Sequence, residues 1–118
     1  MGLSNSAMVD GANGIRSNLG GAQLHTGNPG TGGAANKSSA AMEVPSWTTP
    51  TADGDFGLAA PMVFEGGTPN GPVTCISLWS NTSGSGVWKG NFALTGDNTF
   101  DSNGVITIET FDLNGSAT

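Results

Sequence analysis

The feature that most constrains the fold is a change of hydrophobic period at about residue 41. From there onward, apolar and polar residues alternate with a period of two, and clusters rich in Gly, Asn and Ser separate the alternating segments. This pattern is typical of short β-strands joined by turns. The segments it marks are 42–47 (interrupted by Pro45), 56–65, 73–80, 87–95 and 105–113. We therefore expect an antiparallel β-sandwich or a jelly-roll-like domain over residues 41–118.

Before the period changes, residues 4–19 carry the pattern of a short helix. Apolar residues recur there at helical intervals, and Ser4 or Ser6 can cap the first turn. Two glycines within the segment lower its helix propensity by about 2 kcal/mol, so the helix needs a surface to pack against. That surface lies in its own domain or in a partner. The side chains expected to form an assembly interface are Met8, Ile15, Leu19 and Leu24.

Residues 20–40 have the composition of a loop. Asn28-Pro29-Gly30 is a turn signal, and Gly32-Gly33 permits further left-handed backbone. A structureless loop of this length is unusual inside a compact domain. Either a short strand around Gln23–His25 interrupts it, or it lies on another subunit. We expect residues 1–40 to form a helix and a Gly-rich arm that precede the β domain.

The composition indicates a folded domain with a thin core. Gly, Ser, Thr, Asn and Pro supply more than half of the 118 residues, while Leu, Ile, Val and Phe make up only about 19%, near the limit for disorder. The three Trp and five Phe nevertheless all follow position 46, within the alternating segments. A folded domain that is completed by neighbouring subunits fits both observations, and we expect a homo-oligomer, provisionally a trimer.

Charge and cysteine content exclude several classes of protein. Three basic and nine acidic residues give a net charge of −6, which is unsuited to binding nucleic acid. No apolar run approaches the length of a membrane span. Cys75 is the only cysteine, so no internal disulfide forms. The sequence shows no signal peptide, and we expect synthesis in the cytosol.

Catalytic patterns are weak throughout. His25 is the only histidine, no serine lies in a Gly-x-Ser-x-Gly turn, and Cys75 sits in an apolar strand segment. A small hydrolase using His25 or a Glu beside a Trp is the third hypothesis that the sequence leaves open. We expect no enzyme activity, no catalytic residues and no cofactor, with His25 bonded to local backbone in its loop.

Two acidic clusters are candidates for calcium. They are Asp97 with Asp101, and Asp53 with Asp55. Neither has the regular ligand spacing or the closing Glu of a calcium loop. Asp and Asn side chains that tighten turns explain both clusters equally well, so no metal site is assigned.

The three tryptophans, Trp47, Trp79 and Trp88, suit either a core or an exposed binding face. Exposed indole rings stack on sugars. A carbohydrate-binding module that attaches to a host glycan is therefore the alternative function.

Several short motifs, taken in order, resemble a known family. They include Ser6–Asp10, the Leu-His-Thr-Gly-Asn-Pro-Gly segment that starts at Leu24, the apolar strand 73–79 ending in Leu-Trp, and Gly90–Thr95. This order is similar to that of small tail-fibre-like or minor tail proteins of bacteriophages, especially those infecting actinobacteria. The resemblance implies a non-enzymatic structural protein of the virion, made in the host cytoplasm, that serves as a capsid decoration or a minor tail component. It implies no active site.

Overall fold

The chain folds into one N-terminal helix and several small antiparallel sheets. The computed structural model describes residues 4–83 and 86–113. In chain order the elements are α1 (Asn5–Ser17), β1 (Gly21–His25), β2 (Phe56–Gly57), β3 (Met62–Phe64), β4 (Pro72–Trp79), β5 (Trp88–Thr99), β6 (Ile106–Ile108) and β7 (Asp112–Leu113). The expected order of a helix followed by an antiparallel β region is confirmed.

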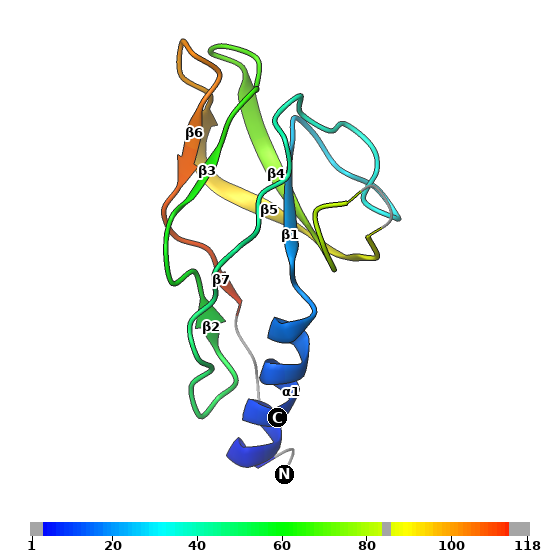
Figure 1. The fold of residues 1–118 in the computed structure, drawn as a ribbon, viewed down its shortest axis with the longest axis vertical. Coiled ribbons are helices and arrows are strands. Elements are labelled where there is room, and N and C mark those ends of the chain that lie inside the picture. Colours follow the sequence, from blue (N-terminus) through cyan, green and yellow to red (C-terminus); the bar gives the residue numbers. More distant parts are fainter. Residues whose placement is uncertain (1–3, 84–85, 114–118) are drawn as a thin grey trace.

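The largest sheet has three strands in the order β1-β4-β5, with β4 in the middle. Two smaller sheets pair β2 with β7 and β3 with β6. The segments 56–65 and 105–113 run antiparallel to each other, and each contributes one strand to both small sheets. In Figure 1 the described part is elongated, with α1 at one end of the long axis and the β3–β6 pair toward the other.

The segment 42–47 does not form the expected strand. It contributes only isolated bridges, Ala22 with Glu43 and Trp47 with Leu58. Pro45 lies between them and has no backbone N–H to donate. The alternation of apolar and polar residues in this segment reflects single contacts with two neighbours, Ala22 and Leu58, and the segment forms a continuous ladder with neither.

Strand β1 settles the two alternatives left open for residues 20–40, because a short strand does interrupt this segment. It pairs with β4 from Gly21↔Trp79 to His25↔Cys75, and all five of its residues are buried. Gly20 and Gly21 allow this approach, since a Cβ on either would collide with the backbone of Ser80 or Asn81.

The helix begins as the sequence predicts. The Ser4 hydroxyl accepts a hydrogen bond from the backbone N–H of Ala7 at 3.2 Å. Ala12 is the buried residue of α1, whereas Ile15 is 57% exposed. Beyond the helix, the indole N–H of Trp47 donates to the carbonyl of Leu19 at 3.0 Å and ties the helix end to the β region.

The core lies between the three-stranded sheet and the β3–β6 pair. Its largest fully buried apolar side chains are Phe64, Phe100, Leu24, Ile76 and Leu78. The ring of Phe100 lies where a Cβ on Gly67 would be, so glycine is required there. Trp47 packs against this core and meets Phe56 of β2 edge-on at 5.4 Å between ring centroids.

Candidate functional site

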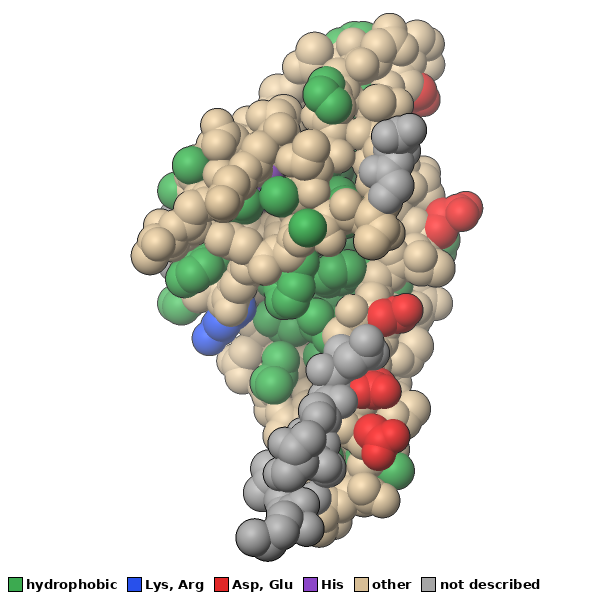
Figure 2. All heavy atoms as spheres, turned by 180° about the vertical axis from the view of Figure 1, so that it is seen from behind, with side chains coloured by type: hydrophobic (Ala, Val, Ile, Leu, Met, Phe, Trp, Pro, Cys, Tyr) green, Lys and Arg blue, Asp and Glu red, His purple; other side chains and the backbone are tan. Residues whose placement is uncertain are grey.

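An apolar groove lies between helix α1 and the three-stranded sheet. It has a volume of about 1000 Å³ and is bounded by α1, by Leu78 of β4, by Phe92 of β5 and by Leu113 of β7. Figure 2 shows hydrophobic side chains gathered in a hollow about midway along the molecule. An apolar hollow of this size is the usual starting point for a binding or assembly site.

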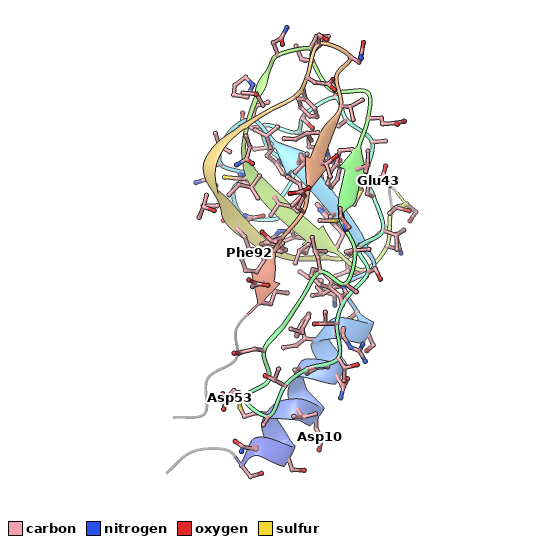
Figure 3. All side chains as sticks on the ribbon, turned by 90° about the vertical axis from the view of Figure 1, so that its left-hand side faces the viewer. Asp10, Glu43, Asp53 and Phe92 are labelled. Atoms are coloured by element: carbon pink, nitrogen blue, oxygen red, sulfur yellow. The ribbon has the colours of Figure 1, made fainter. Side chains whose placement is uncertain are left out.

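Two apolar side chains at the groove are open to solvent. Ile15 of α1 is 57% exposed and Phe92 of β5 is 36% exposed. The ring of Phe92 stands edge-on to Phe111 at 5.5 Å between centroids, which holds it where β5 approaches β7 (Figure 3). A monomer in water gains nothing from exposing these groups, so the groove is suited to contact with another molecule.

The groove is nearly free of charge, whereas one flank beside it is acidic. Among the described residues, only Lys89 and Asp112 carry charge in its lining. Figure 2 shows Asp and Glu side chains along the neighbouring flank, and Figure 3 places Asp10 on α1 with Asp53 in the adjacent loop. A partner that enters the groove therefore meets a mainly apolar surface, with one Lys and one Asp in its lining.

The structure brings three of the four expected interface residues to this groove. Met8, Ile15 and Leu19 all line it, although Leu19 is only 6% exposed. Leu24 lies elsewhere, fully buried in the chain's own core on β1. Phe92 was not among the interface residues expected from the sequence, where its place in an apolar strand segment was the only signal for it.

The three tryptophans are half-buried, and each donates its indole N–H within the chain. Trp47 donates to Leu19, Trp79 to the hydroxyl of Ser77 at 2.8 Å, and Trp88 to the side chain of Asn91 at 2.9 Å. The amine of Lys37 also lies 5.7 Å from the centroid of the Trp79 ring. These contacts give all three rings a structural role.

His25 takes part in a buried polar network. Its Nδ1 lies 2.8 Å from the carbonyl oxygen of Ala35, and its Nε2 lies 2.7 Å from Oγ of Ser77. The expected bond to local loop backbone is confirmed, while the contact with Ser77 could not be read from the sequence. Burial lowers the pKa of His25, and the positive charge of Lys37 acts in the same direction.

The pairing of Ser77 with His25 has the distance of a nucleophile and its base, but its setting is structural. Both residues are fully buried. The partner of Nδ1 is a backbone carbonyl rather than a carboxylate. The Ser77 hydroxyl accepts from Trp79 and contacts His25, so it links β1 to β4, and His25 in turn contacts the 26–37 loop through Ala35.

Among the candidate metal residues, Asp101 acts in a turn. Asp101 Oδ1 accepts from the backbone N–H groups of Asn103 and Val105 at 2.8 and 3.0 Å, which tightens the turn before β6. The side chain of Asp97 lies outside the described residues. In the described part of the chain, no three His, Cys, Asp or Glu side chains are grouped to hold a metal ion.

Two further features complete the survey of the described residues. Cys75 is a free, half-buried thiol on β4. Within residues 4–83 and 86–113, no helix has the length and apolar character needed to span a membrane.

Comparisons of the chain with protein-family models, with curated proteins and with solved structures find no match.

Proposed function

We propose that this chain is a non-enzymatic structural protein of a bacteriophage virion, a capsid decoration or minor tail component, that works by assembling with copies of itself. The observation that carries the proposal is the apolar groove beside α1, with Ile15 and Phe92 exposed at it. An exposed apolar hollow on a small domain with a thin core is best explained by a partner that covers it.

The assignment to a virion rests on the sequence motifs that resemble small phage tail proteins. The strand β1, the His25 network and the Pro29 turn give these motifs a structural purpose, since they hold the 26–37 loop against the sheet. The finer expectation of a β-sandwich or jelly roll remains part of this proposal. The copy number has two candidates, the trimer expected from the sequence and a two-fold dimer, which light scattering distinguishes by mass.

The carbohydrate-binding alternative has less support. Tryptophans that stack on sugars present an open ring face. Here all three rings are half-buried, Lys37 lies over the Trp79 ring, and Gly33 packs against the Trp88 ring. Intrinsic tryptophan fluorescence that shifts on titration with host cell-wall glycans would favour this alternative over assembly.

The assembly itself is tested by light scattering on the full chain over a range of concentrations. Ile15→Glu places a charge at the groove and is expected to weaken self-association, because burying an unpaired carboxylate is unfavourable. Val44→Glu is the matched control, since Val44 is 68% exposed and does not line the groove. A wild-type chain that stays monomeric at every concentration contradicts the proposal.

The location is tested on particles. Antibodies against the chain, imaged on virions purified from the phage that encodes it, are expected to label the head or the tail. Particles whose proteins, measured by mass spectrometry, do not include this chain would remove the virion assignment.

A further inference from the structure

The outer edge of strand β5 is open, and the hydrogen-bond pattern shows which groups it presents. Ala22 exchanges both of its backbone bonds with Glu43, at 2.8 and 3.0 Å, so it faces away from β4. Backbone groups alternate in direction along a strand. Gln23 and its partner Ser77 therefore bond to each other across β1 and β4.

The same alternation continues through β4 into β5. Because Ser77 faces β1, Ile76 and Leu78 face β5 and bond with Phe92 and Gly90, to which they are paired. Asn91 and Ala93 must then direct their N–H and C=O groups away from the sheet. In the described part of the chain, no loop backbone bonds to either residue.

The two outer edges of this sheet, on β1 and on β5, differ in whether other backbone segments pair with them. The outer edge of β1 is covered by bridges to Glu43 and Lys37. The outer edge of β5 has no such cover among the described residues. The segment 90–95 also contains no Pro and no charge, which are the usual devices that keep an edge strand from pairing.

The open edge adjoins the apolar groove. Phe92, which lies between Asn91 and Ala93, is exposed and lines the groove. An added strand would bond to the edge while its alternate side chains entered the groove beside Phe92. This combination of free backbone groups and an apolar recess is the geometry of strand addition.

We propose that β5 pairs with β5 of a second copy of this chain, antiparallel and about a two-fold axis at Phe92. The inference rests on the proposed self-assembly and names its surface. Asn91 and Ala93 lie one residue on either side of Phe92. Asn91 therefore pairs with Ala93 of the second copy, and Ala93 pairs with Asn91 of the second copy. Each pair exchanges two backbone hydrogen bonds, which gives four between the two chains. The two sheets become one continuous six-stranded sheet, with the two Phe92 side chains adjacent across the axis.

Charge and size favour a second copy as the occupant. Two chains with a net charge of −6 repel through their acidic flanks, whereas the segment 90–95 is neutral, so its pairing with a second copy brings no like charges together within this segment. A typical interface buries about 800 Å² per partner. That is roughly an eighth of the 6334 Å² surface, a share that a groove-bearing face of a molecule 48 Å long and 26 Å wide can supply.

The first test removes the backbone N–H of Ala93, which points away from the sheet, and leaves the hydrogen bonds between β4 and β5 in place. Ala93→Pro deletes the intermolecular donor, while Ala93→Val keeps it and is the matched control. Analytical ultracentrifugation is expected to show a dimer dissociation constant raised by about thirtyfold in the Pro variant, because two bonds per dimer are lost. Ala93→Lys, which places two like charges at the pairing, is a second variant with the same expected direction.

The second test reads the register. In a Cys75→Ser background, Phe92→Cys is expected to form an intermolecular disulfide on mild oxidation, because facing residues at the axis have the required Cα separation. Ala93→Cys is expected not to cross-link, since its counterpart lies diagonally away.

The outcomes separate this inference from the proposed function. An oligomer that persists in Ala93→Pro and Ala93→Lys, or a closed trimer without the Phe92→Cys cross-link, overturns the β5 pairing and leaves self-assembly intact. A wild-type monomer overturns both.

Discussion

We expect the hydroxyl of Ser77 to make a large contribution to the free energy of unfolding. It accepts a hydrogen bond from the indole N–H of Trp79 at 2.8 Å and lies 2.7 Å from Nε2 of His25. Since the Ala35 carbonyl beside Nδ1 can only accept, the neutral ring carries its proton on Nδ1. The Ser77 hydroxyl must then donate to Nε2, and Ser77→Ala leaves two polar groups without a partner.

The expected loss follows from the burial of these two groups. A buried group left without a partner costs about 1–3 kcal/mol. His25 is fully buried and bears the full cost, whereas Trp79 is half-buried and recovers part of it from water. We expect Ser77→Ala to lower the free energy of unfolding by about 2–4 kcal/mol, a large share of the roughly 5–15 kcal/mol typical of a domain.

Ser38→Ala is the matched control, because it deletes the same atom from a different setting. The Ser38 hydroxyl oxygen is buried and has no hydrogen-bond partner among the described residues. Its removal relieves an unpaired polar group and should leave the unfolding free energy unchanged or raise it by about 1 kcal/mol.

Urea denaturation followed by tryptophan fluorescence measures both variants. The midpoint should fall for Ser77→Ala and hold or rise for Ser38→Ala, with the same slope in each. Equal losses in the two variants, or a loss below about 0.5 kcal/mol in Ser77→Ala, would refute the assignment of a bridging hydroxyl.

Three further changes test other parts of the fold. Burial lowers the pKa of His25 in the folded chain, so the unfolded chain binds a proton at a higher pH than the folded chain does. The free energy of unfolding should therefore be greatest above about pH 6.5 and fall as the pH drops below that value, by at most about 1.4 kcal/mol per pH unit. Denaturation series between about pH 7.5 and 5 would show this slope, and His25→Gln should flatten it. Gly14→Ala has open space around the new methyl group and should raise stability by about 0.5–1 kcal/mol, seen as a higher thermal midpoint; a lower midpoint contradicts the helix assignment. Gly33→Ala should destabilise by about 1–3 kcal/mol, because Gly33 has φ +68° and a Cβ there would collide with the ring of Trp88. Gly32→Ala, with φ +90° but no neighbour within reach, should cost less than Gly33→Ala in the same thermal assay.

Local patterns predicted the elements that local physics controls. A cap at Ser4 or Ser6, the helix after it and the strand at 73–80 were predicted, and the structure has the cap at Ser4, α1 over Asn5–Ser17 and β4 over Pro72–Trp79. Capping depends on atoms three residues apart, and strand alternation depends on which face is buried. Capping and strand alternation therefore depend on residues that are close together in the sequence.

The candidate site was only partly evident. Helical spacing singled out Met8, Ile15 and Leu19, and all three line the groove. Phe92 was not singled out because the groove exists only where β5 passes α1, elements that are far apart in the chain. Leu24, the only large apolar residue of the 20–40 segment, was also expected at an interface, although its pairing with Ile76 buries it inside the chain.

The sequence by itself determined that this protein has one short helix, a set of short antiparallel strands and Asx-rich turns, because these depend on neighbouring residues. Only the tertiary structure decided that β1 joins β4, that His25 meets a serine 52 residues away, and that the edge of β5 stays open beside an apolar groove. Those features depend on which strands become neighbours. Which strands pair is decided by how the whole chain buries its apolar side chains, so the sequence of one segment does not indicate it.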